Sequence, residues 1–135
     1  MNSISRDERK RKGFGRFLRS FSYSVEGLRY TIRYEQSILV MFIAAFIAVL
    51  LGIGLKISIS EWIFVFLAIG IVLGIELINT SIEAAVDLIS PGIHPLAKIA
   101  KDTSSAAVFV FSVISFIIGC FIFIPKIMTI VEMGW

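Results

Sequence analysis

The residues best suited to chemistry lie in the middle of the chain, on a segment expected to form one long helix. Counted from the first acid, they fall at offsets 0, 3, 4, 7 and 11, so at about 100° per residue they share one helix face. They are Glu76, Asn79, Thr80, Glu83 and Asp87. Three carboxylates on one stripe repel one another unless a cation joins them. An oxygen-rich set of this kind suits Mg²⁺, which takes one or two carboxylates and fills its other positions with water and phosphate.

The stripe lies where an apolar helix would leave the membrane. With Glu61 as the outer boundary and about 1.5 Å per residue, Glu76 lies about 22 Å in and Glu83 about 33 Å in, against a hydrocarbon core of about 30 Å. Ionisable groups inside a span are costly unless they pair, bind a cation or face water. The stripe therefore predicts a site at the inner membrane surface, a depth at which a water-soluble nucleotide could meet the head-group hydroxyl of a lipid.

Neighbouring segments bring further charges to the same depth. Lys98 and Lys101 are cations suited to phosphate, and Asp102 is an acid suited to a second contact. Glu35 stands at the junction of two other predicted helices. In a structural alternative, Asp87 is a surface acid that pairs with Lys98 or Lys101. Likewise, Arg33 could neutralise Glu35, and His94 could be a polar loop residue.

The composition is that of a membrane protein. Hydrophobic residues make up 57% of the 135 residues and charged residues 17%, whereas soluble chains average about 25% charged residues. Charge-free runs cover residues 36–55, 62–75 and 103–125, and a span needs about 20 residues. We predict an all-α membrane protein, with a flexible basic tail and then a single domain. The expected ranges are 1–12 for the tail, 13–135 for the domain, about 14–33 for an amphipathic surface helix, and about 36–55, 61–90 and 102–125 for three transmembrane helices.

Smaller features refine these boundaries. Gly52 and Gly54 are expected to loosen the end of the first span, and Ser60 is expected to cap the next helix. The single cysteine, Cys120, falls inside the third span, where we interpret it as a packing residue.

The basic residues predict the orientation. Nine of the thirteen Lys and Arg residues precede the first apolar run, and Lys98 and Lys101 lie between the second and third spans. Positive charge favours the cytoplasmic side, so we expect the N-terminus inside and the C-terminus outside. Lys56 and Lys126 would face the other side.

Several chemistries are not supported by the sequence. It contains no G-x-x-x-x-G-K-[ST] loop and no protein-kinase signature, which excludes the familiar soluble nucleotide folds. One histidine is too few for a His-based lipid phosphatase, and no cluster has zinc spacing. We expect no nucleic-acid partner.

The motif E-x-x-N-[ST]-x-I-E-x-x-x-D spans residues 76–87 and is followed by H-P-L-A-K at 94–98 and A-K-D at 100–102. In these segments, and from residue 13 to residue 127 as a whole, the chain resembles the bacterial diacylglycerol kinase family. It is most similar to the Gram-positive branch, whose members act as undecaprenol kinases. The resemblance implies a homotrimer in the bacterial plasma membrane, with active sites where subunits meet. It also implies ATP and a lipid alcohol as substrates, with Mg²⁺ as cofactor.

The resemblance implies roles for particular residues. Glu76 would be the base that takes the lipid hydroxyl proton, Asn79 would orient the site, and Glu35 and Glu83 would hold the metal with the ATP phosphates. Asp87 and Lys98 belong to the same motifs. The positions implied to contact the nucleotide, in addition to Glu35 and Glu83, are Arg16, Tyr23, Gly92, Ile93, His94, Lys101 and Asp102. The chain departs from the branch at Gln36-Ser37, where Arg-Asn is usual, and at Ser104-Ser105, which replace an alanine-rich pair.

Two alternatives stay open at this point. Diacylglycerol could be the main substrate in place of undecaprenol, because the phosphate-binding motifs would be the same. A non-enzymatic membrane protein, such as a transporter subunit or a holin, could use the acids to line an ion path. Such a path would also place acids inside the first and third spans, which have none.

Overall fold

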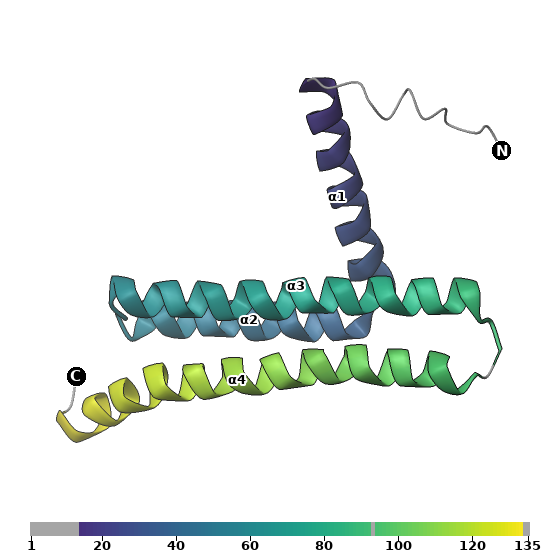
Figure 1. Ribbon diagram of the computed structural model, residues 1–135. Helices are drawn as coiled ribbons and strands as arrows, with labels where there is room; N and C mark the ends of the chain where they lie inside the picture. The colour runs from purple at the N-terminus through teal and green to yellow at the C-terminus, as the bar shows by residue number, and fades with distance from the viewer. Residues whose placement is uncertain (1–13, 93, 134–135) are drawn as a thin grey trace. The chain divides into compact units, whose positions relative to one another are not determined.

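The computed structural model describes residues 14–92 and 94–133, and the predicted tail 1–12 lies outside them (Figure 1). The described residues form four helices: α1 (Phe14–Tyr34), α2 (Gln36–Gly54), α3 (Ile59–Ile89) and α4 (Pro95–Met133). The chain divides into two compact units, Met1–Tyr34 and Glu35–Trp135. The all-α prediction is confirmed, and the single domain over 13–135 stays a prediction.

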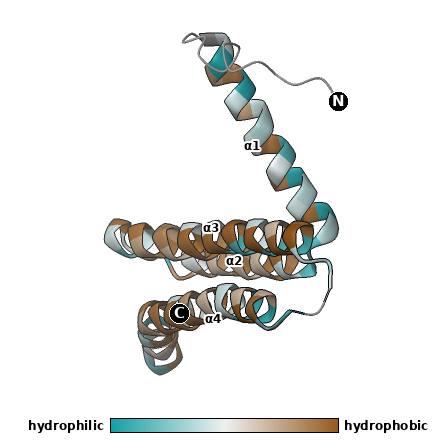
Figure 2. Ribbon diagram, turned by 45° about the vertical axis from the view of Figure 1, so that its right-hand side comes forward, coloured by the Kyte–Doolittle hydropathy of each residue, from teal (hydrophilic) through white to brown (hydrophobic). Residues whose placement is uncertain are grey.

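Helices α2, α3 and α4 are each long and apolar enough to cross a membrane. Brown, hydrophobic residues dominate all three, whereas teal residues recur along α1 (Figure 2). The chain is therefore a multi-pass membrane protein. Helix α4 is longer than the predicted span at both ends, because it begins at Pro95 and continues through Pro125. Proline suits the first position of a helix, where its missing N–H is not needed, and it is tolerated inside spans.

A capping box starts α3. The Ser58 hydroxyl accepts a hydrogen bond from the Glu61 backbone N–H at 3.3 Å, and the Glu61 carboxylate accepts one from the Ser58 N–H at 2.6 Å. The prediction that Ser60 caps this helix is wrong, since Ser60 lies inside it. The S-x-x-E spacing of Ser58 and Glu61 lets each residue satisfy the other's free backbone N–H.

Helix α2 ends in a tight reversal that uses a left-handed residue. Lys56 has φ 50°, its N–H donates to the Ile53 carbonyl at 3.2 Å, and the Ile57 N–H donates to the Gly52 carbonyl at 3.1 Å. This pair of bonds is the Schellman arrangement. Gly52 is buried, and a Cβ there would lie 2.7 Å from Cη2 of Trp62. Gly52 thus permits a close approach and does not loosen the helix end.

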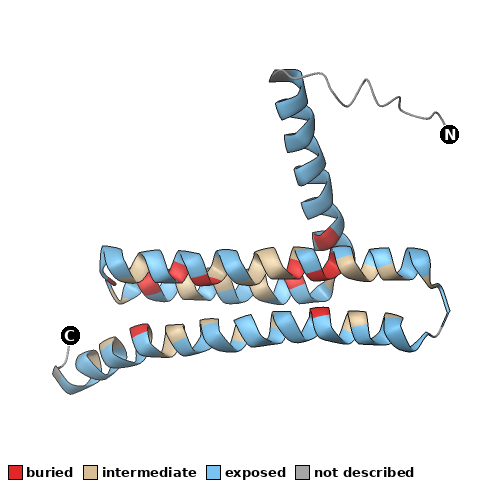
Figure 3. Cartoon of the chain, viewed as in Figure 1, coloured by how far each residue is buried: buried red, intermediate tan, exposed pale blue. Residues whose placement is uncertain are grey.

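Within Glu35–Trp135, α3 is the central element. It packs along α4 over most of its length and against α2 less extensively, while α2 and α4 touch little. Five apolar side chains of the described residues are buried, and broad faces of all three helices are exposed (Figure 3). The buried ones are Ile38, Ile57, Val65, Ala68 and Ile122. So much apolar surface requires a cover of lipid or of other protein chains.

Candidate active site

The predicted stripe on α3 is its most deeply buried polar face. Glu76 is 3% exposed, Asn79 and Thr80 are each 8% exposed, Glu83 is half-buried and Asp87 is exposed. The Asn79 side-chain amide donates a hydrogen bond to the Glu83 carboxylate at 3.3 Å. The structure thus brings Glu76, Asn79 and Glu83 together along one face, as their spacing predicts.

Glu76 receives a hydrogen bond from another helix. The Ser37 hydroxyl, in the first turn of α2, donates to Oε1 of Glu76. In the part of the chain that the structure describes, this is the one hydrogen bond that Glu76 makes with its carboxylate. A buried carboxylate with one donor retains unused acceptor capacity. Oε2 of Glu76 is therefore available to a ligand that carries a proton or a positive charge.

Asn79 also has an unused acceptor. Its Oδ1 atom is buried and has no hydrogen-bond partner among the described residues, although its amide nitrogen is used by Glu83. Across residues 14–92 and 94–133, no three His, Cys, Asp or Glu side chains converge on a metal position. A cation here would thus be held by one or two carboxylates, an amide oxygen, water and phosphate. That ligand set is ordinary for Mg²⁺, so the residues fit this ion.

An ion pair joins the end of α3 to the beginning of α4. The Lys101 ammonium lies 2.7 Å from the Asp87 carboxylate, and both side chains are partly exposed. A second ion pair, within α4, joins Lys98 to Asp102, and the two residues lie on either side of Lys101 in the sequence. Of the two partners considered for Asp87, the structure selects Lys101. Ser104 follows as a buried residue whose hydroxyl donates to the Lys101 carbonyl at 2.9 Å.

The connection before α4 contains three of the predicted nucleotide contacts. His94 is exposed, and its Nδ1 accepts a hydrogen bond from the Leu96 N–H at 3.2 Å, which caps the start of α4. The Gly92 carbonyl accepts a bond from the Ser90 hydroxyl at 3.4 Å. Ile93 lies outside the described residues. His94 thus has a structural role in addition to its predicted one.

The other predicted residues lie on α1 and at the start of α2. Glu35 is half-buried at the N-cap of α2, and its side chain makes no capping bond. Among the described residues, Glu35 and Arg33 form no ion pair, so the proposed neutralisation of Glu35 by Arg33 is not observed. Arg16 and Tyr23 are exposed on α1, in the other compact unit.

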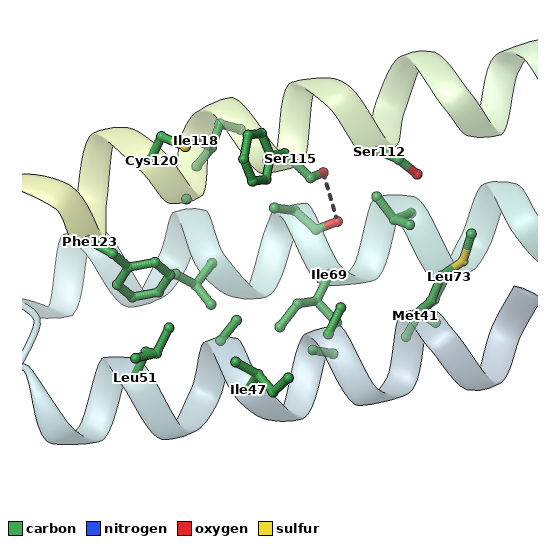
Figure 4. Close-up of a pocket in the computed structure, with 18 of the residues that line it drawn as sticks. Met41, Ile47, Leu51, Ile69, Leu73, Ser112, Ser115, Ile118, Cys120 and Phe123 are labelled. Atoms are coloured by element: carbon green, nitrogen blue, oxygen red, sulfur yellow. Dashed lines mark hydrogen bonds between the residues drawn. The ribbon is translucent and has the colours of Figure 1, made fainter.

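An apolar cavity of about 800 Å³ lies between α2, α3 and α4 (Figure 4). Its wall includes Met41 and Leu51 of α2, Leu73 of α3, and Phe123 of α4, with Cys120 among the other α4 residues. It also includes Ser37, Ser112 and Ser115, so its few polar groups are hydroxyls. Ser37 also donates a hydrogen bond to Glu76, so the buried carboxylate lies next to a residue of the cavity wall.

Sequence reasoning missed Ser37 as a site residue. Its departure from the usual Arg-Asn pair was a visible signal, but the contact with Glu76 joins residues 39 positions apart. Such a contact depends on how two apolar helices pack, which helical periodicity does not specify.

Comparison with known proteins identifies the family of this chain. Residues 22–123 match the family described as prokaryotic diacylglycerol kinase. The undecaprenol kinase of Bacillus subtilis (strain 168) is 44% identical over 117 residues, which cover 87% of this chain and 95% of the relative. A diacylglycerol kinase of Helicobacter pylori (strain J99) is 39% identical over 98 residues, covering 73% of this chain and 77% of the relative. The diacylglycerol kinase of Escherichia coli (strain K12) is 31% identical over 108 residues, which cover 80% of this chain and 88% of the relative. This chain belongs to the prokaryotic diacylglycerol kinase family.

Proposed function

We propose that this lipid kinase transfers the γ-phosphoryl group of MgATP to the hydroxyl of undecaprenol at the cytoplasmic membrane surface. The observation that carries the proposal is the burial of Glu76 in a spanning helix, where it accepts a hydrogen bond from Ser37, a residue that lines an apolar cavity. A carboxylate in such a place is costly unless it serves a ligand. Membership of a kinase family favours this reading over an ion path in a transporter subunit or a holin.

Glu76 is the proposed base. It would accept the proton of the lipid hydroxyl on Oε2 while the lipid oxygen forms a bond to the γ-phosphorus. The bond from the γ-phosphorus to the bridging oxygen then breaks and ADP leaves. Phosphoryl transfer of this kind depends mainly on alignment and charge neutralisation, so the protein needs few covalent steps.

Glu83, Glu35 and the free Oδ1 of Asn79 are the groups proposed to hold Mg²⁺ with the ATP phosphates. When bound, the ion supplies positive charge that stabilises the phosphoryl group being transferred. The Asn79 amide keeps the Glu83 carboxylate in place through their hydrogen bond. The unused Asn79 oxygen supports the choice of a cation, because a buried acceptor without a donor is unfavourable.

Several further residues are proposed to contact the nucleotide. Lys101 would bind a phosphate, with Asp87 holding its ammonium group beforehand. Lys98 and Asp102 form the adjacent pair. The remaining proposed contacts are Arg16, Tyr23, Gly92, Ile93 and His94.

The cavity between α2, α3 and α4 is the proposed location for part of the lipid chain. Its volume of about 800 Å³ and its apolar wall suit hydrocarbon. The hydroxyl end of the lipid would then lie beside Ser37 and Glu76. This arrangement lets the substrate react without leaving the bilayer.

Three further features complete the proposal. The chain forms a homotrimer in the bacterial plasma membrane, α1 lies on the cytoplasmic surface, and the N-terminus is inside with the C-terminus outside. The resemblance to the family supports the trimer. The concentration of basic residues before the first span supports the orientation.

Glu76→Gln tests the assignment of the base. Loss of a general base should lower kcat by about 10²- to 10⁴-fold, while binding of MgATP persists because the amide keeps the size of the side chain. Glu132→Gln, an exposed residue near the end of α4, is the matched control. Retained turnover in a Glu76→Gln protein of normal assembly would refute the role.

Lipid preference is tested by assaying undecaprenol and diacylglycerol side by side, with radiolabelled ATP in mixed micelles. We expect a higher kcat/KM for undecaprenol, since the relative of that name is 44% identical to this chain. The Escherichia coli diacylglycerol kinase is 31% identical. A higher kcat/KM for diacylglycerol would make phosphatidic acid the product.

A further inference from the structure

One side-chain hydrogen bond joins α2 to α3 in the described residues, and it ends on the proposed base. The Ser37 hydroxyl donates to Oε1 of Glu76. Ser37 has no other side-chain hydrogen bond there, so its hydroxyl proton is committed to this carboxylate. A side chain in the first turn of α2 therefore contacts the residue of α3 that is proposed to act as the base.

Glu76 needs such a donor more than the other acids among the described residues do. At 3% exposure it has almost no access to water, and a buried carboxylate is stabilised only by the donors that reach it. No Lys or Arg among the described residues pairs with it. Its flexible side chain also has several rotatable bonds, and a bond to one oxygen restricts which way the other oxygen points.

Ser37 occupies two environments at once. It lines the apolar cavity between α2, α3 and α4, and it binds the buried carboxylate. A lipid hydroxyl that approaches along the cavity wall would therefore reach Glu76 next to Ser37.

We propose that Ser37 is a positioning residue, whose hydroxyl holds Oε1 of Glu76 so that Oε2 faces the hydroxyl of the lipid alcohol. The inference rests on the proposed function, because it takes Glu76 to be the base. Ser37 keeps its own proton throughout, and the lipid proton goes to Oε2. Without Ser37 the carboxylate adopts several orientations, few of which are productive.

The kinetic test compares Ser37→Ala, Ser37→Thr and Ser81→Ala. Ser81 is the matched control because it is an exposed α3 serine whose hydroxyl bonds to its own helix, at the Leu77 carbonyl. Ser37→Ala should lower kcat by about tenfold or more, as expected for loss of a hydrogen bond to a charged group, with KM for MgATP unchanged. Ser37→Thr keeps the hydroxyl and should recover most of the rate. Wild-type kcat in Ser37→Ala would overturn the inference, as would an equal loss in Ser37→Ala and Ser37→Thr.

A second measurement does not depend on kinase activity. Dicyclohexylcarbodiimide is an apolar reagent for buried carboxyl groups, and its attachment to Glu76 can be followed by mass spectrometry. Labelling should be several-fold faster in Ser37→Ala than in wild type or Ser37→Thr, because the carboxylate is no longer held. Equal labelling rates would overturn the inference. If the wild-type protein phosphorylated no lipid alcohol, the proposed function would fail, while this comparison would still decide whether Ser37 holds Glu76.

Discussion

Lys101 has two roles at the residue scale, one observed and one proposed. It forms an ion pair with Asp87 at 2.7 Å, and it is a proposed phosphate contact. A partly exposed pair of this kind contributes little to stability, because solvent screens the attraction. The ion pair is therefore expected mainly to fix the position of the Lys101 ammonium group, so that it can bind a phosphate of the nucleotide.

Two substitutions separate these roles. Lys101→Met removes the cation and should raise KM for MgATP by about tenfold or more, whereas Asp87→Asn breaks the same pair but leaves the cation. We expect a much smaller rise in KM for Asp87→Asn, measured by steady-state kinetics with saturating lipid. If the two variants show the same KM, Lys101 acts only through its ion pair.

The stripe of Glu76, Asn79 and Glu83 was predictable because helical periodicity determines which side chains share a face. The contacts of Ser37 with Glu76 and of Lys101 with Asp87 were not specified in this way. They depend on which faces of separate helices meet, and nearly uniform apolar spans such as α2 and α4 give little periodic signal.

At the scale of elements, the helices were predicted better than their ends. Ser60 is expected from the sequence to cap α3, whereas the S-x-x-E box of Ser58 and Glu61 places the cap at Ser58. The third span is expected to begin at about residue 102, yet α4 begins at Pro95, because proline suits the first position of a helix. In both cases the local sequence allows more than one helix boundary, and the packing of the helices determines which one forms.

Gly52 gives a stability prediction at this scale. In Gly52→Ala the new methyl group would lie 2.7 Å from Trp62 and 3.0 Å from Ile57. Overpacking of this kind should lower the free energy of unfolding by about 1–3 kcal/mol, measured by SDS titration in mixed micelles. Gly54→Ala is the matched control, since nothing lies within 4 Å of its Cβ position. The close approach would be unimportant if the two variants were equally stable.

At the scale of the whole molecule, exposed apolar residues far outnumber the five that are buried among the described residues. Phe116 and Phe121 of α4, for example, are 73% and 78% exposed. Lipid can cover such residues as well as protein can, so burial alone gives no subunit number. The proposed trimer therefore rests on the family resemblance.

Native mass spectrometry of the detergent-solubilised protein tests the assembly. We expect a main species of three chains, each of 15.0 kDa. If the association is specific, the species of three chains should remain the main one when the charge on the ions is reduced during the measurement. A monomer that retained full lipid kinase activity would contradict the proposed assembly.

The sparse core of α2, α3 and α4 has a consequence for how the protein behaves in membranes of different composition. With so few buried side chains, an isolated chain holds its helices together weakly, and subunit association would supply the missing packing. Association in a bilayer depends on mass action within two dimensions. Specific activity should then fall as the protein is diluted with inert phospholipid at constant substrate mole fraction, so the bilayer area available to each subunit becomes a determinant of catalysis.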